Sequence, residues 1–245
     1  MMNKFNIFLS RKENYKESAN KIVKALKIRA DIIWIEEFMC TENKEEKLKN
    51  SVIYFLCNST LVKELVKSLK ETNCYIFNKE FFEKNYTKLE MQKKLIDNEI
   101  KTPRIFENFD TKKSKLPIFC KENIHAGMVF KIYTQNTINK FFEKFSHDKF
   151  YLEESIESNL EIKLYVVNNN IYTKNDIEDP SCVKDICMKI SQVLNLDVFS
   201  VDIIQKDSDY FVFDVNPSAG FYMLDEARDK LIYEIEKIGE EKWRY

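Results

Sequence analysis

The chain has 245 residues, of which 44% are hydrophobic and 32% charged, and this composition is typical of a globular protein. Its 39 Lys and Arg residues nearly balance its 40 Asp and Glu residues. The basic excess of a nucleic-acid-binding protein is therefore missing, and no nucleic-acid partner is expected. Only three glycines are present, which excludes the glycine-rich phosphate loop and the G-x-G-x-x-G dinucleotide motif.

The expected compartment is the cytoplasm. Residues 1–14 lack the apolar segment and the cleavage site of a signal peptide. Apolar runs such as residues 52–57 are far shorter than the roughly 20 residues that span a bilayer, so no membrane association is expected. Cys57, Cys74 and Cys120 lie in strand-like apolar runs, which predicts buried free thiols in a reducing compartment. Two histidines in the whole chain are too few to favour a zinc site.

Residues 1–78 are predicted to form an α/β domain with a mostly parallel sheet. Apolar strand-like runs alternate there with segments of helical spacing, which is typical of βαβ units. The run at 51–57 is apolar throughout, as expected of a strand buried on both faces. Ser59 and Thr60 are expected to cap the helix that follows it. The expected strands are residues 6–10, 31–35, 51–57 and 74–77, and the expected helices are 15–27 and 61–69.

After residue 78 the pattern changes to an α+β arrangement with antiparallel hairpins. Asn168, Asn169 and Asn170 tolerate left-handed turns, so they are predicted to close a hairpin of strands 161–167 and 171–173. Further strands are predicted at 116–121, 128–133, 150–156, 198–205 and 210–215, and helices at 87–100, 137–145, 181–194 and 224–238.

The most informative segment is residues 200–220. Asp214 and Asn216 are two residues apart on one predicted strand and therefore point to the same face, and the hairpin can bring Asp202 beside them. Buried carboxylates need a partner, and Mg²⁺ prefers such oxygen ligands while it leaves room for phosphate oxygens. Spacing alone leaves open that Asp214 and Asn216 cap the strand end ahead of Pro217.

This segment resembles the closing motif of the ATP-grasp superfamily, in the branch of glutathione synthetases and RimK-type amino-acid ligases. In that family a strand acid precedes an acid-x-Asn motif and a turn of small residues. The matching residues here are Asp202, then Asp214-Val215-Asn216, then Pro217 to Gly220. The resemblance implies that Asp202, Asp214 and Asn216 are magnesium ligands that bridge the ATP phosphates.

The resemblance covers about residues 74–230 and implies an ATP-grasp fold, combining α/β and α+β parts. Residues 1–78 would be a short, Rossmann-like domain ahead of it. Residues 79–245 would be the ATP-grasp domain, with a small lid subdomain at about 103–155 and a catalytic subdomain at about 156–245.

Two lysines match further landmarks in the family's order. Lys88 opens a segment similar to the family's K-x6-L-x4-I-x2-P pattern, and Lys121 ends a strand similar to its P-x-x-x-K strand. Both are implied phosphate contacts, a role that suits the compact charge of lysine. The loop after Lys121 departs from the family because it holds one glycine, Gly127, so His125 is expected to face the phosphates or the acceptor; the alternative is an ordinary loop residue.

Two further segments resemble the family's nucleotide-binding strands. One resembles the hinge strand, whose backbone reads the adenine, and the other resembles the strand that carries Asp/Glu-x-Arg beneath the phosphates. In the second strand Lys163 replaces the usual arginine, and the alternative that Lys163 is an ordinary exposed hairpin residue stays open. The implied residues are Glu153, Glu154, Ser155 and Ile156 in the hinge, and Glu161 and Lys163 in the other strand.

The resemblance implies a carboxylate–amine ligase with ATP and Mg²⁺ or Mn²⁺ as cofactors. ATP would phosphorylate an acceptor carboxylate, and an amine would then displace the phosphate to form an amide. Ser218 and Gly220 are expected to present backbone N–H groups to the acyl-phosphate, and Arg228 is a candidate carboxylate clamp. The implied partners are a small-molecule or peptide carboxylate and an amine, and homo-oligomerisation is left open.

Two other functions stay open. Inositol phosphate kinases share the fold and the metal motif, but they would need a strongly basic acceptor pocket, of which a net charge of −1 gives no sign. A non-catalytic nucleotide-binding domain is the other alternative, and the scarcity of glycine favours it slightly. In addition, aspartate stands at 214 where glutamate is commoner in the family, which alters the expected metal geometry.

Overall fold

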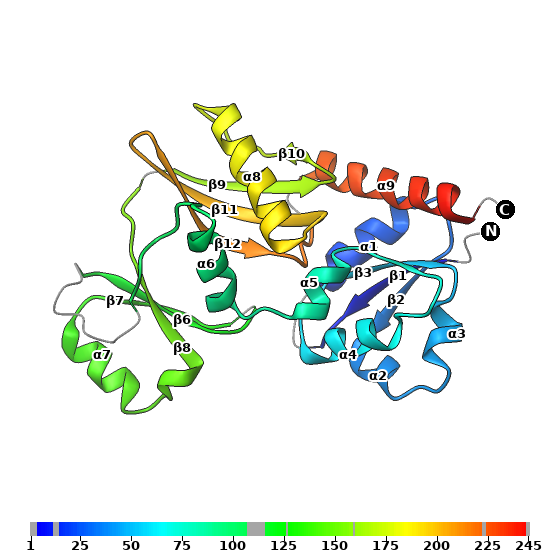
Figure 1. The fold of residues 1–245 in the computed structure, drawn as a ribbon, viewed down its shortest axis with the longest axis horizontal. Helices are drawn as coiled ribbons and strands as arrows, with labels where there is room; N and C mark the ends of the chain where they lie inside the picture. The colour runs from blue at the N-terminus through cyan, green and yellow to red at the C-terminus, as the bar shows by residue number, and fades with distance from the viewer. Residues whose placement is uncertain are drawn as a thin grey trace. The chain divides into compact units, whose positions relative to one another are not determined.

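The computed structural model describes residues 4–11, 15–106, 116–125, 127–158, 160–221 and 224–243 (Figure 1). The chain divides into two compact units, both discontinuous in sequence. Unit 1 consists of Met1–Asn85, Lys163–Val201 and Val215–Tyr245, and unit 2 consists of Tyr86–Ile162 and Asp202–Asp214. The domain boundaries expected at residues 78, 103 and 156 stay predictions.

The N-terminal part of unit 1 is a parallel sheet in the order β2-β1-β3-β4, as the alternating pattern predicts. Its strands are β1 (Lys4–Leu9), β2 (Ala30–Trp34), β3 (Ser51–Phe55) and β4 (Tyr75–Ile76). The connecting helices are α1 (Lys16–Ala25), α2 (Ile35–Met39), α3 (Lys44–Leu48), α4 (Thr60–Ser68) and α5 (Lys79–Lys84). The helices α2, α3 and α5 were not predicted, because five or six residues are too few to show a helical period.

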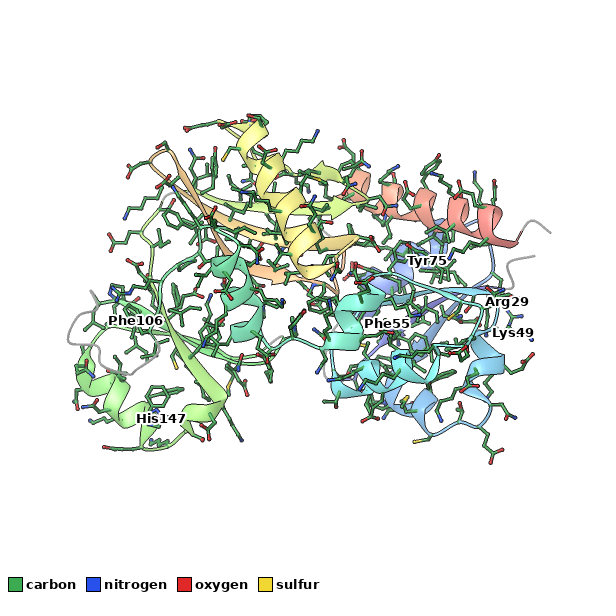
Figure 2. All side chains as sticks on the ribbon, viewed as in Figure 1. Arg29, Lys49, Phe55, Tyr75, Phe106 and His147 are labelled. Atoms are coloured by element: carbon green, nitrogen blue, oxygen red, sulfur yellow. The ribbon has the colours of Figure 1, made fainter. Side chains whose placement is uncertain are left out.

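Both faces of this sheet are buried, as expected from its apolar strands. On one face Phe5 and Ile7 join a core that includes Leu231 of α9 (Asp225–Trp243). On the other face the ring of Phe8 packs against those of Phe38 and Phe55 at 5.2 and 5.3 Å between centroids. Phe55 is labelled in Figure 2. The strand β1 thus lies inside the sheet, paired with β2 and β3, and is packed on both faces.

A second sheet has the order β10-β9-β11-β12, and its residues belong in part to each unit. Its strands are β9 (Leu160–Val167), β10 (Asn170–Tyr172), β11 (Val198–Lys206) and β12 (Asp209–Asn216), and α8 spans Pro180–Leu194. Asn168 and Asn169 take left-handed φ angles of 44° and 66°, so the predicted asparagine turn between β9 and β10 is confirmed. Two residues, 207 and 208, connect β11 to β12, the strand that carries Asp214.

Unit 2 contains an antiparallel sheet in the order β5-β8-β6-β7. Its elements are β5 (Ile105–Phe106), β6 (Ile118–Glu122), β7 (Val129–Ile132), β8 (Phe150–Glu154), α6 (Lys88–Asp97), α7 (Gln135–Phe142) and the short helix η2 (His147–Lys149). On one face Cys120 and Leu152 pack with Ile138 of α7. The register pairs Lys121 with Tyr151 and Phe119 with Glu153, so Lys121 and Glu153 both lie on the opposite face.

All six cysteines are free thiols. Cys57 and Cys120 are buried as expected, whereas Cys74 is only half-buried, because it precedes the two-residue strand β4 instead of lying inside it. Within the described ranges, the search for membrane spans found no helix that is both long and apolar enough to cross a bilayer.

Candidate nucleotide and metal site

Lys88 and Asp214 form an ion pair in unit 2. Lys88 is the first residue of α6, which begins there because Thr87 and Glu90 form a reciprocal capping box. Asn123, in the loop after β6, caps the same helix end by accepting a hydrogen bond of 2.8 Å from the backbone N–H of Leu89. The helix end and the loop together fix the position from which Lys88 reaches Asp214.

The Asp214 carboxylate is ionised in this environment. Burial by itself would raise its pKa, but the charge and the hydrogen bond of Lys88 outweigh burial, so the pKa lies below its usual value. Lys121 and His125 lower it further. Asp214 is thus an anion held among basic groups.

A second ion pair joins Lys121 of β6 to Glu153 of β8. The Lys121 ammonium also donates a hydrogen bond of 3.1 Å to the backbone carbonyl of Phe213 and lies 5.7 Å from the centre of that ring. Only 1% of the Glu153 side chain is exposed. Burial raises the pKa of Glu153, although Lys121 partly offsets this effect.

Gln92 is a member of this cluster that the sequence analysis missed. It is buried on α6, and its side-chain amide donates to the Phe213 carbonyl at 3.2 Å and to the Glu153 carboxylate at 3.4 Å. It lies four residues after Lys88, on the same helix face, so the helical period was a signal that could have identified it.

His125, which was expected to face the phosphates or the acceptor, lies close to this cluster. Although the residue as a whole is only partly buried, its Nε2 atom is inaccessible to solvent. Burial, with a smaller effect of Lys88, lowers the pKa of His125 to about 4, so the imidazole is neutral at pH 7. A hydrogen bond to the backbone of Tyr86 holds the ring. The contact of His125 with the phosphates or the acceptor stays a prediction.

The loop of residues 122–127, whose residue 126 lies outside the described part, is held by specific contacts. The N–H of Asn123 donates to the Lys149 carbonyl at 2.8 Å, and the N–H of Gly127 donates to the Ile124 carbonyl at 3.3 Å. A Cβ at Gly127 would lie 2.9 Å from the Cβ of Glu122, so this position requires glycine.

The residues expected to bind magnesium supply only oxygen donors. Asp214 and Asn216 are half-buried on β12, and Asp202 is half-buried on the neighbouring strand β11. Within the described ranges, no three His, Cys, Asp or Glu side chains gather as a metal site. This donor set therefore fits a hard cation such as Mg²⁺ that takes one or two carboxylates and keeps phosphate and water ligands, and it does not fit a closed protein cage.

The turn after β12 differs from the expectation. The N–H of Ser218 donates to the side-chain oxygen of Asn216 at 2.9 Å, and its hydroxyl donates to the Cys57 carbonyl at 3.1 Å. The left-handed residue is Phe221, with φ of 52°, and no described glycine has a positive φ. The N–H of Ser218 is thus engaged within the turn, and Gly220 does not take a left-handed φ; the catalytic roles of both residues stay predictions.

Three other expected site residues make local contacts. The guanidinium of Arg228 pairs with Asp225 at 2.8 Å and Asp229 at 3.5 Å on its own helix, and its role as a carboxylate clamp stays a prediction. Lys163 on β9 lies 6.0 Å from the centre of the Tyr165 ring. Glu161, on the same strand, is exposed.

The predicted hinge begins in β8. Glu154 is the last residue of that strand and is exposed, and its N–H donates to the Arg104 carbonyl at 2.8 Å. Ser155 and Ile156 follow the strand and are half-buried. Recognition of adenine by this segment stays a prediction.

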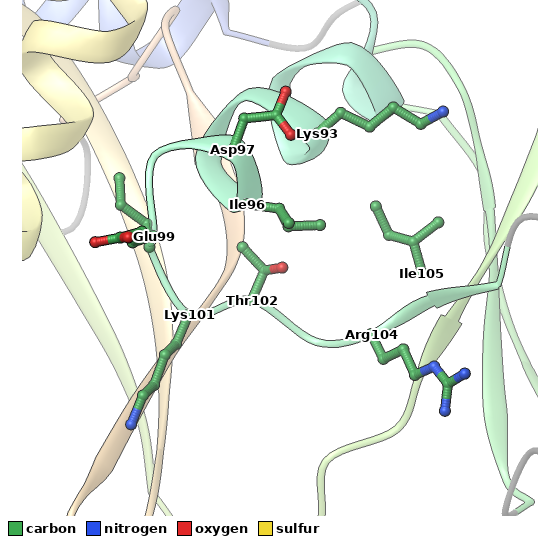
Figure 3. Close-up of a pocket in the computed structure, with 9 residues that line it drawn as sticks. Lys93, Ile96, Asp97, Glu99, Lys101, Thr102, Arg104 and Ile105 are labelled. Atoms are coloured by element: carbon green, nitrogen blue, oxygen red, sulfur yellow. The ribbon is translucent and has the colours of Figure 1, made fainter.

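An open pocket of about 590 Å³ lies elsewhere in unit 2. It is formed by the second half of α6 and the segment of residues 99–105, and Lys93, Ile96 and Arg104 are among its lining residues (Figure 3). None of the predicted site residues lines it, so it is not the nucleotide site proposed below.

Three solved structures illustrate what the chain is similar to. The D-alanine–D-alanine ligase of Bacillus anthracis complexed with ATP is 15% identical, with a TM-score of 0.71 and coverage of 98% of this chain and 99% of that chain. A RimK domain ATP-grasp protein of Sphaerobacter thermophilus is 12% identical, with a TM-score of 0.73 and coverage of 96% and 98%. The ATP-grasp ligase PsnB complexed with a phosphomimetic variant of its minimal precursor, Mg and ADP is 13% identical, with a TM-score of 0.74 and coverage of 98% and 100%.

At the level of sequence, residues 170–233 match the family model of the RimK-like ATP-grasp domain. No curated protein matches the chain. The identities to the solved structures are low, so these structures establish the fold. The resemblance drawn from residues 200–220 is confirmed: the chain has the ATP-grasp fold, and its C-terminal part matches a RimK-like ATP-grasp domain.

Proposed function

We propose that the protein is an ATP-dependent carboxylate–amine ligase. The observation that carries the proposal is the cluster of Lys88, Lys121, Glu153 and Asp214, in which two lysines from different elements converge on oxygen ligands suitable for Mg²⁺. The ATP-grasp fold and the RimK-like match at residues 170–233 support the same reaction class.

In the proposed reaction, an oxygen of the acceptor carboxylate attacks the γ-phosphorus of ATP, and ADP leaves. The amine then attacks the carbonyl carbon of the acyl-phosphate, loses a proton and expels inorganic phosphate, which leaves an amide. Lys88 and Lys121 would hold the phosphates, Phe213 and the backbone after β8 would face the base, and Gln92 would keep Glu153 in place.

Mg²⁺ fits this arrangement and would be held by Asp214 and Asn216 on β12, with Asp202 on β11. When bound, it would neutralise charge on the β- and γ-phosphates. A peptide is a plausible acceptor class, because PsnB, a structure of the same fold, is solved in complex with a precursor peptide.

The first test is nucleotide binding, measured as a shift in melting temperature. Binding at about 100 times the dissociation constant stabilises a protein by roughly 2.7 kcal/mol, so millimolar Mg-ATP should raise the melting temperature clearly. A screen of carboxylate and amine pairs should then show phosphate release and an amide product by mass spectrometry. No shift with Mg-ATP would refute the proposal, and phosphate transfer to a hydroxyl would favour a kinase.

A further inference from the structure

The cluster in unit 2 is electrically balanced without any ligand. Its two ammonium groups, on Lys88 and Lys121, are each paired with one carboxylate, on Asp214 and Glu153. These two positive and two negative charges cancel, and neither Asp214 nor Glu153 is left without a paired ammonium group.

A divalent cation that arrives alone would have to displace the Lys88 ammonium from Asp214. The displaced ammonium would stay close, since only 17% of its side chain is exposed and its helix end is fixed by Thr87 and Asn123. Lys121, which also acts on Asp214, would repel the cation as well. Repulsion between such charges is strong because the cluster is poorly solvated.

A triphosphate that arrives with the cation removes both costs, the unpaired Lys88 ammonium and the repulsion between the lysines and the cation. The phosphate oxygens can accept hydrogen bonds from the ammonium groups of Lys88 and Lys121, and the carboxylate of Asp214 can then coordinate the cation. Every charge is then paired again, with different partners. Binding of the cation and of the nucleotide is thus coupled through one side chain, and the coupling is reciprocal.

We propose that Lys88 excludes a bare divalent cation from Asp214, so that the metal enters the site only together with the nucleotide. This inference rests on the proposed function, because it assigns the metal and the phosphates to the same cluster. The inference gives Lys88 a second role. Besides contacting phosphate, Lys88 prevents the metal ion from binding before the nucleotide.

The test uses Mn²⁺ as a paramagnetic substitute for Mg²⁺, with free Mn²⁺ followed by electron paramagnetic resonance in the full-length protein. The wild type should bind Mn²⁺ alone only weakly. Lys88→Met removes the charge and keeps the length of the side chain, so it should bind Mn²⁺ alone at least tenfold more tightly while its affinity for Mg-ATP falls. These opposite changes would not result from a purely structural role.

Two further variants control the result. Lys93→Met, on an exposed position of the same helix, should change neither affinity. The double variant Lys88→Met with Asp214→Asn should lose the gained Mn²⁺ affinity, which assigns the gain to Asp214. If Lys88→Met fails to fold, Lys88→Gln removes the charge and keeps a donor for Asp214.

Equal Mn²⁺ affinity in the wild type and Lys88→Met would overturn the inference, whether both bind tightly or both bind weakly. Failure of the wild type to bind Mg-ATP would refute the proposed function instead, while a gain of Mn²⁺ binding in Lys88→Met would still support exclusion of the bare cation. The two failures are therefore distinguishable.

Discussion

The hydroxyl of Tyr54 donates a hydrogen bond of 2.7 Å to the backbone carbonyl of Ala219, which is 165 residues later in the chain. Tyr54 lies on β3 of the parallel sheet, and Ala219 lies in the turn after β12; both are fully or almost fully buried in unit 1. The Tyr54–Ala219 bond and the bond from the Ser218 hydroxyl to the Cys57 carbonyl together connect this turn to β3 and to the residues that follow β3.

Tyr54→Phe should lower the free energy of unfolding by about 1–3 kcal/mol, because it leaves the buried Ala219 carbonyl without a donor and creates no cavity. Urea denaturation measures the change. Tyr233→Phe is the matched control, since Tyr233 is 55% exposed and should cost little. Equal stability of Tyr54→Phe and wild type would mean that the turn does not depend on this bond.

Asn78 is expected to be among the least replaceable side chains of unit 1. It is buried, its amide donates to the carbonyls of Val198 and Pro217, and its oxygen accepts from the N–H groups of Asp197 and Val198. Its φ of 56° is left-handed, so glycine is the substitution that keeps the backbone unstrained.

Asn78→Gly should therefore destabilise the protein by about 2–5 kcal/mol through the lost hydrogen bonds alone. Asn85→Gly, at the other end of α5, is the control, because Asn85 has a similar φ of 53° and takes no part in this network. Its stability should stay close to that of the wild type. Similar losses for both, measured by chemical denaturation, would show that backbone conformation rather than hydrogen bonding makes Asn78 necessary.

The pH dependence of stability follows from His125. Burial lowers its pKa in the folded state to about 4, below its ordinary value near 6.5, so the unfolded chain binds the extra proton between these pH values. Stability should be fully present above about pH 6.5 and fall by up to about 3 kcal/mol as the pH drops toward 4. Denaturation of the nucleotide-free protein in EDTA should show this slope, and His125→Gln should flatten it. An unchanged slope in His125→Gln would mean that other groups cause it.

Asp214→Asn is now expected to destabilise the nucleotide-free protein. If the carboxylates of Asp202 and Asp214 only repelled each other in the absence of metal, the substitution would be neutral or stabilising. The ion pair with Lys88 reverses this expectation, because the substitution leaves a poorly solvated ammonium unpaired. We expect a loss of about 1–3 kcal/mol.

A double-mutant cycle tests this pairing directly. If Lys88 and Asp214 stabilise each other, Lys88→Met should cost less in the Asp214→Asn background than in the wild type. Additive losses would show that the two side chains do not interact in solution.

The fold was largely predictable where local patterns are strong. The alternation of strands and helices up to residue 78, the Thr87 cap of α6 and the asparagine turn at 168–169 are all properties of neighbouring residues, and the structure contains each of them. The cap of α4 was wrong in detail: Ser59 is the N-cap residue, but its side chain makes no capping bond.

The site was less predictable because its partners are distant in sequence. Lys88 and Lys121 were proposed from the resemblance to the ATP-grasp family, but their carboxylate partners lie 126 and 32 residues away, and no local pattern encodes such pairs. The neutrality of His125 depends on burial by other segments, which a sequence does not reveal. The resemblance thus proposed candidate groups but not their ion-pair partners or charge states.

The scarcity of glycine has a consequence for the unfolded chain. Among the described residues, seven of the ten non-glycine residues with left-handed φ are asparagines, so asparagine occupies turns where glycine is common. Asparagine has fewer accessible backbone conformations than glycine, so the unfolded ensemble has a lower entropy and less is lost on folding, while each left-handed asparagine carries some strain in the native state. The use of asparagine at these turns therefore lowers the conformational entropy of the unfolded state, at the expense of some backbone strain in the folded state.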